Sequence, residues 1–165
     1  MKETTSTFEG QLRVTQVITI ALVMGVGVFF LFCLMVNRVA LDGGPNAISW
    51  IALGFFVVVF VLHLILPKLT TATALKSSEW QKLTGCDVNE KPSKLFPLFQ
   101  TQHIIGCALL ESAGFFNAFA YQTTQYMGNV IATVAVIALI LMKWPTRFGV
   151  ESWLADRARE LENQT

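Results

Sequence analysis

The side chains with the greatest capacity for chemistry lie in one apolar segment, between residues 101 and 122. Within it His103, Cys107 and Glu111 follow one another at intervals of four residues. Four residues make about one turn of an α-helix, so the three side chains share a face if the segment is helical. An imidazole, a thiol and a carboxyl group in such a row can relay protons, or form a catalytic set if the thiol ionises.

A helical projection of this segment, at about 100° per residue, separates two faces. One face carries polar and small residues: Gln100, His103, Cys107, Glu111, Gly114, Asn117, Ala118 and Tyr121. The other is apolar: Ile105, Ala108, Leu109, Phe116 and Phe119. We therefore expect Glu111 to face neighbouring helices, where removal from water favours its protonated, uncharged form.

The candidate partners of Glu111 are neutral polar groups, because no basic residue lies inside the apolar core of any run. If the chain turns back near residue 124, Thr133 and Val136 lie at the depth of Glu111. The same count places Asn117 beside Asn129 and predicts a hydrogen bond between their amides. The candidate intramembrane polar site therefore comprises His103, Cys107, Glu111, Asn117, Asn129 and Thr133.

The two histidines of the chain, His63 and His103, form a second candidate site. His63 lies near the carboxyl end of the apolar segment 47–66, and His103 lies near the amino end of the segment 101–122. Both ends are expected on the cytoplasmic side, so the two histidines sit at similar depth. Such a pair can make the chain a redox anchor that ligates a b-type haem axially or is linked to a quinone, or it can bind a metal together with a carboxylate. The alternative is that both histidines hydrogen-bond to loops or lipid headgroups. Apart from this haem, no cofactor is expected.

Composition places these residues in a membrane. Hydrophobic residues make up 53% of the 165 residues and charged residues 14%, against roughly 25% charged in a soluble domain. The net charge of +1 gives no general attraction to nucleic acid. The dispersed cysteines Cys33, Cys86 and Cys107 suggest neither a disulfide framework nor a zinc site. No nucleophile–base motif or phosphate-binding loop is present, so we expect no enzyme.

Four apolar runs approach the length of about 20 residues that a spanning helix needs. They cover residues 14–36, 47–66, 101–122 and 126–144. The last has a short apolar core, about 24 Å long as a helix, which Lys143 can extend by reaching toward the interface. The first is too long for a signal peptide and is expected to be retained. The sequence thus predicts an all-α membrane protein, a bundle of four transmembrane helices.

Lysine and arginine set the orientation, because cytoplasmic loops are enriched in them. Eleven of the 12 lie in the amino-terminal segment, the central loop 67–99 or the carboxyl-terminal tail, and only Arg38 lies elsewhere. Both termini are therefore expected in the cytoplasm, and the membrane is expected to be the bacterial cytoplasmic membrane. Residues 1–146 then form the membrane domain and 147–165 a cytoplasmic tail.

Local signals refine this layout. Asn46, after a glycine-rich turn at residues 43–45, is expected to cap the second spanning helix. Residues 77–83 are expected to form a short surface helix within the central loop. The tail is expected to be an amphipathic helix with Val150, Leu154, Ala158 and Leu161 on one face. Small residues that permit close helix packing are Gly25, Gly27, Gly114 and Ala118.

The stretch IIGCALLESAGFF resembles the ion-carrying helix of rotary ATP synthase subunit c. The matching positions are Gly106, Ala108, Leu109, Leu110, Glu111 and Ala113. The resemblance implies proton or cation translocation, with Glu111 as the cycling carboxylate and His103 as a relay. The chain departs from that family in lacking its polar loop motif and in carrying the carboxylate on the third of four spans.

The layout as a whole resembles the small four-span bacterial inner-membrane proteins that have no assigned activity. This resemblance implies a non-enzymatic helical bundle that assembles with itself or with another membrane protein. The expected partners are therefore the lipid bilayer, further copies of the chain or a membrane-protein partner, and no nucleic acid.

Overall fold

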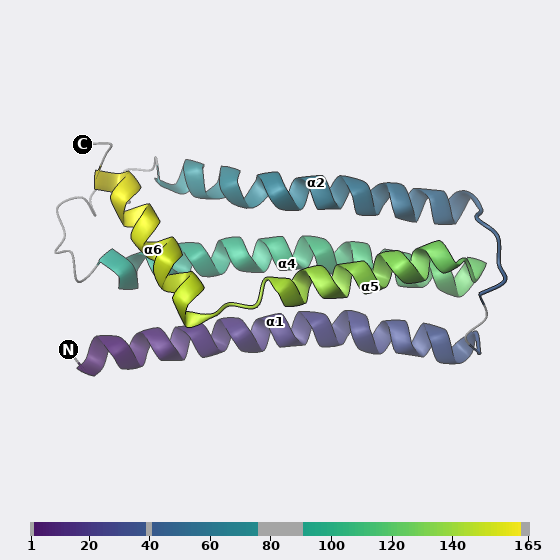
Figure 1. Cartoon of the computed structure of the whole chain (residues 1–165), viewed down its shortest axis with the longest axis horizontal. Helices are drawn as coiled ribbons and strands as arrows, with labels where there is room; N and C mark the ends of the chain where they lie inside the picture. Colours follow the sequence, from purple (N-terminus) through teal and green to yellow (C-terminus); the bar gives the residue numbers. More distant parts are fainter. Residues whose placement is uncertain (1, 39–40, 76–90, 163–165) are drawn as a thin grey trace.

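The computed structural model describes residues 2–38, 41–75 and 91–162, and every regular element in those ranges is an α-helix. The helices are α1 (Lys2–Val36), α2 (Ala47–Leu75), α4 (Lys91–Thr124), α5 (Met127–Met142) and α6 (Arg147–Glu162). Helices α1, α2, α4 and α5 lie side by side along the long axis of the molecule (Figure 1). Helix α6 runs obliquely at the end where both termini lie (Figure 1).

Three of these helices are long and apolar enough to cross a membrane: Phe8–Val36 in α1, Ala47–Pro67 in α2 and Leu95–Thr124 in α4. Helix α5 has only 16 residues, about 24 Å against a hydrocarbon core of about 30 Å. Helices α5 and α6 are bent by 71° relative to each other, and the pair taken together makes a fourth candidate span. The prediction of an all-helical chain is confirmed for the described residues, and these contain three or four candidate membrane spans.

Helix α4 is the central helix, because it packs against α1, α2, α5 and α6. Half of its apolar window (50%) is buried, against 22% in each of α1 and α2. The outer helices instead expose large apolar side chains, including Val17 and Met35 on α1 and Trp50 and Ile51 on α2. An exposed apolar surface of this kind is matched by lipid or by another protein.

Burial along α4 separates its two faces. Of the polar and small face, Cys107, Gly114, Asn117, Ala118 and Tyr121 are buried, while Ala108 and Phe119 of the opposite face are exposed.

Gly114 allows two neighbours to approach at once. A Cβ atom on it would lie 2.9 Å from Val26 Cγ1 in α1 and 3.1 Å from Val136 Cγ1 in α5. Within the described residues nothing lies within 4 Å of the Cβ position of Gly27, so the packing role predicted for Gly27 stays a prediction. Gly25 and Gly27 are two residues apart and point to opposite sides of their helix, so only Gly25 can face α4.

The central loop is shorter than predicted, because two prolines lie inside helices. Helix α2 continues through Pro67 to Leu75, and α4 begins at Lys91 and includes Pro97. A proline inside a helix costs about 3 kcal/mol in water. Apolar surroundings oppose ending a helix, since the freed backbone groups then have no water to bind. The surface helix predicted for residues 77–83 lies outside the described residues.

At the opposite end of the molecule the two connections press together. Asn46 caps α2 as predicted, its Oδ1 accepting the Ser49 N–H at 3.1 Å. A Cβ atom on Gly43 would lie 1.8 Å from the Thr124 carbonyl oxygen, so only glycine permits this contact. The α1–α2 connection is thereby held against the turn between α4 and α5, where Gln125 has a positive φ of 54°.

Helix α6 folds back onto the start of α1 and of α4. Val150 and Leu154 are buried in a cluster with Leu12, Leu95, Phe96 and Leu98. Ala158 packs against the same cluster, and the side chain of Leu161 lies outside the described residues. Gln16 of α1 donates to the Pro145 carbonyl at 3.0 Å. The amphipathic face of the tail is therefore used to pack against the other helices.

Candidate functional site

His103 is held between α1 and its own helix. Its Nε2 lies 2.8 Å from Thr19 Oγ1, and Thr19 Oγ1 also donates to the Thr15 carbonyl at 2.9 Å. A hydroxyl has one proton, so with that proton given to Thr15 it accepts the Nε2–H of His103. On α4, Phe99 stacks on the ring at 5.8 Å and Cys107 Sγ lies 3.6 Å from Nε2. The imidazole is thus fixed from three directions.

His63 makes the corresponding link between α2 and α4. Its Nδ1 donates to the Gly106 carbonyl at 2.8 Å, and the residue is only 3% exposed. A Cβ atom on Gly106 would lie 3.5 Å from the ring, an ordinary van der Waals distance, so the imidazole rests closely on the backbone of α4. The two histidines therefore serve two different helix pairs, because His63 joins α2 to α4 and His103 joins α4 to α1.

Among the described residues, no cluster of three or more His, Cys, Asp and Glu side chains is arranged to hold a metal ion. Haem ligation by His63 and His103 stays a prediction. Each ring already uses one nitrogen in a hydrogen bond that serves the helix packing.

Glu111 lies against α1, one turn beyond Cys107. Its Oε1 lies 3.2 Å from the position that a Cβ atom would take on Gly25, so the glycine makes room for the carboxyl group. Val136 is predicted to lie at the depth of Glu111 if the chain turns back near residue 124. It packs instead against Gly114, about one turn further along α4. Glu111 is half-buried, whereas Cys107 is fully buried.

The two buried asparagines do not pair with each other. Asn117 Nδ2 donates to the Ala52 carbonyl of α2 at 3.1 Å and to the Ala113 carbonyl of its own helix at 2.9 Å. In the described part of the chain, both amide atoms of Asn129 lack a hydrogen-bond partner. The predicted amide pair is therefore wrong. Thr133, the other predicted residue of α5, donates to the Asn129 backbone carbonyl at 2.9 Å.

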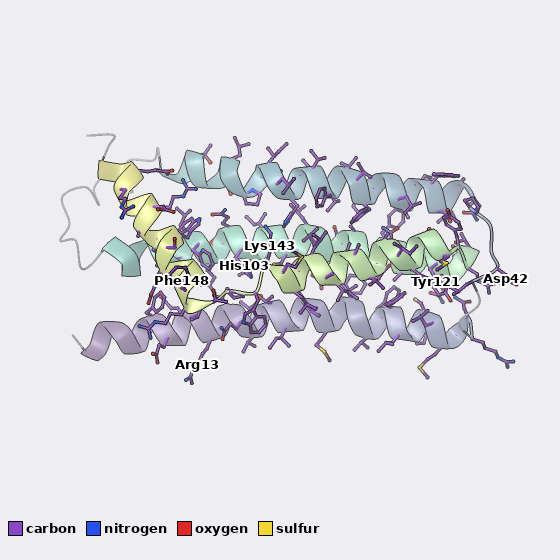
Figure 2. The ribbon with its side chains drawn as sticks, viewed as in Figure 1. Arg13, Asp42, His103, Tyr121, Lys143 and Phe148 are labelled. Atoms are coloured by element: carbon purple, nitrogen blue, oxygen red, sulfur yellow. The ribbon has the colours of Figure 1, made fainter. Side chains whose placement is uncertain are left out.

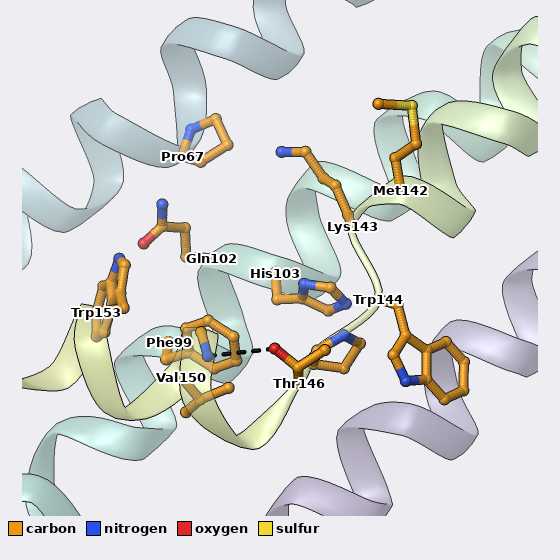
Figure 3. A pocket seen from close by; sticks show the side chains of 12 residues that line it. Pro67, Phe99, Gln102, His103, Met142, Lys143, Trp144, Thr146, Val150 and Trp153 are labelled. Atoms are coloured by element: carbon orange, nitrogen blue, oxygen red, sulfur yellow. Dashed lines mark hydrogen bonds between the residues drawn. The ribbon is translucent and has the colours of Figure 1, made fainter.

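A cavity of about 240 Å³ lies where α4 passes Pro67 of α2 and the connection between α5 and α6 (Figure 3). His103 forms part of its wall, together with Gln102, Lys143 and Trp153. Figure 2 places His103 and Lys143 toward the end that carries α6, and Tyr121 and Asp42 toward the other end. A row of His103, Cys107 and Glu111 therefore leads from the cavity along α4.

Sequence reasoning missed this cavity and also missed Thr19. The cavity joins residues of α2, α4 and the α5–α6 connection, and no spacing along the chain reveals such a meeting. Its only signal is the pair Lys143 and Trp144 at the end of an apolar run, a combination typical of a membrane interface. Thr19 is a hydroxyl in an apolar run, and its pairing with His103 depends on the rotation of two helices.

No family model matches the chain, and no curated protein or solved structure is significantly similar to it.

Replacing Thr19 with valine tests the link between α1 and His103. We expect Thr19→Val to lower the free energy of unfolding by roughly 1 kcal/mol more than Thr15→Val. Thr15 is equally buried, but its hydroxyl bonds only to the Gln11 carbonyl of its own helix. Titration of the purified variants with a denaturing detergent measures the difference. Equal losses would show that the bond to His103 adds nothing to stability.

Proposed function

We propose that the chain is a multi-pass integral membrane protein in which α1, α2, α4 and α5 cross the bilayer as a four-helix bundle. Two observations support this proposal: the exposed apolar surfaces of α1 and α2, and the inward position of the polar groups of α4. Both termini lie at the same end (Figure 1). The distribution of lysine and arginine favours the cytoplasmic side of a bacterial cytoplasmic membrane for that end.

Within the membrane, we propose that the bundle acts as a non-enzymatic assembly or partner-binding unit. The observation that carries this proposal is the use of its reactive side chains. His63 bonds to Gly106, His103 to Thr19 and Asn117 to Ala52, each between two helices. Groups engaged in this way hold helices together, which favours a structural role over a catalytic one.

The outer faces of α1 and α2 are the surfaces available to a partner. They carry large apolar side chains and are the least buried of the long helices. Association in a bilayer depends on close packing and on hydrogen bonds between helices. The proposed partners are therefore lipid, a second copy of the chain or another membrane protein.

Glu111 is proposed to act as a protonated structural group in this bundle. A permanently charged carboxylate at mid-membrane costs about 2.5–3.5 kcal/mol on insertion scales. The carboxyl group is shielded on one side by α1 at Gly25. An uncharged acid in this position needs only shape and hydrogen-bonding capacity, both of which an amide supplies.

Cysteine labelling in intact cells tests the proposed topology. In a Cys86→Ser background, Asp42→Cys and Glu160→Cys place a thiol at an exposed position at either end of the molecule. The native Cys33 and Cys107 are buried and serve as the unlabelled background. We expect a membrane-impermeant maleimide to label only Asp42→Cys, and to label Glu160→Cys after permeabilisation. Labelling of both in intact cells would contradict the topology.

Replacing Glu111 with glutamine tests the proposed role of the carboxyl group. We expect Glu111→Gln to keep the mass of the purified assembly and to change the unfolding free energy by less than about 0.5 kcal/mol. Glu111→Lys, which brings a charge to the same depth, is expected to cost roughly 2.5–3.5 kcal/mol.

The alternative function is proton or cation translocation through Glu111 with His103 as relay. The observation that favours it is the row from the cavity through His103 and Cys107, whose side chains lie 3.6 Å apart. Proton flux into liposomes separates the two functions. Flux that wild-type protein supports and Glu111→Gln abolishes would overturn the structural role in favour of translocation.

A further inference from the structure

The cavity beside His103 has a wall that favours a negatively charged occupant. Lys143 is among the residues that line it, and no aspartate or glutamate is. The polar side chains that join Lys143 in the wall are Gln102, His103 and Thr146. Among the described residues, the lining of this cavity therefore carries a positive charge and no carboxylate.

Lys143 is available to such an anion. Within the described ranges, no carboxylate forms an ion pair with it. The nearby arginines are engaged, because Arg147 binds Glu9 and Glu151, and Arg157 binds Glu160. Figure 3 shows the amino group of Lys143 pointing into the space between Pro67 and Gln102.

The start of α6 adds to this field. Thr146 caps the helix by accepting the Gly149 N–H at 3.2 Å, and both residues line the cavity. The dipole of α6 places a partial positive charge at this end of the helix, although the N–H groups of Gly149 and Val150 are already bonded to Thr146. Lys143 and the start of α6 are thus joined by the same short connection and act on the same space.

Aromatic rings form the apolar part of the wall. Phe99 and Trp153 pack edge to face at 5.4 Å, and Trp144 lies on the connection that carries Lys143. Tryptophan next to lysine at the end of an apolar helix is typical of the membrane–water interface. Basic pockets between helices on the cytoplasmic side of a membrane bind lipid headgroups. The volume of about 240 Å³ suits a headgroup and excludes a whole lipid.

We propose that this cavity binds a phosphate ester, supplied by the headgroup of an anionic phospholipid. Lys143 holds the phosphate and the dipole at the start of α6 favours its negative charge, while Gln102 and His103 contact its ester groups and the aromatic rings face the glycerol. The lipid source rests on the membrane placement proposed above. The preference for a phosphate ester rests only on the wall of the cavity.

Native mass spectrometry of the detergent-solubilised protein tests the proposal. Phosphatidylglycerol and phosphatidylcholine with identical acyl chains are added separately, and the bound lipid is counted. We expect one phosphatidylglycerol to bind in preference to phosphatidylcholine, and Lys143→Gln to weaken it about fivefold. Lys143→Arg, which keeps the charge, is expected to stay within about twofold of wild type. Lys143 is exposed, so these variants should fold.

Arg13→Gln is the matched control, because it removes the same charge from an exposed position on α1 (Figure 2). Equal weakening by Arg13→Gln and Lys143→Gln would overturn the proposal, as would equal binding of the two lipids. A further arm adds glycerol 3-phosphate. Its binding in a Lys143-dependent manner without any phosphatidylglycerol binding would overturn the lipid source. Because every arm uses solubilised protein, failure here is independent of the topology measured by labelling.

Discussion

The structure depends on one constraint: most polar side chains removed from water must find partners within the protein, although in the described part of the chain both amide atoms of Asn129 have none. An unsatisfied polar group in hydrocarbon costs several kcal/mol. Helix α4 carries histidine, glutamate and asparagine in an otherwise apolar sequence, and it lies at the centre of the molecule. Its central position fits this constraint, because α4 turns its polar face to its neighbours and leaves apolar side chains such as Phe119 exposed on the opposite face.

The hydrogen bonds that satisfy this constraint also fix the arrangement of the helices. His63 and Asn117 join α4 to α2 at two depths, and His103 joins it to α1. Glycines at two contact points make room for neighbouring side chains, Gly25 for Glu111 and Gly114 for Val26 and Val136.

Two ionisable groups, Glu111 and Lys143, take no part in these interhelical bonds. Glu111 has a position shaped for it, and Lys143 lines a cavity without a counter-ion in the described residues. The functional proposals therefore concentrate on these two groups, one within the membrane and one at its edge.

Much of the fold could be predicted from the sequence, because it follows from residue types along one helix. The projection of α4 separated buried Cys107 and Asn117 from exposed Phe119, and the capping role of Asn46 followed from its place after a turn. The extents of α2 and α4 could not be predicted in the same way. Pro67 and Pro97 end helices in water, whereas these helices continue through them.

The candidate site was less predictable, because it depends on how helices rotate against one another. The position of the turn near residue 124 predicts the depth of Asn129 but not the direction of its side chain. The expected hydrogen bond between Asn129 and Asn117 is therefore absent from the described residues. The hydrogen bond between Thr19 and His103 could not be predicted for the same reason, because it depends on the rotation of α1 and α4. The cavity is assembled from three parts of the chain, and only Lys143 and Trp144 signalled its position.

The accessibility of nitroxide labels along α4 in a bilayer tests the central claim most directly. Labels replace residues 107, 111 and 118 on the polar face and residues 108, 112 and 119 on the opposite face. Collision rates are then measured with oxygen, which dissolves in lipid, and with a nickel chelate, which stays in water. The account predicts low oxygen collision on the polar face, high oxygen collision on the opposite face, and little nickel contact on either. Higher oxygen collision at residue 111 than at residue 108, or nickel contact on both faces, would contradict it.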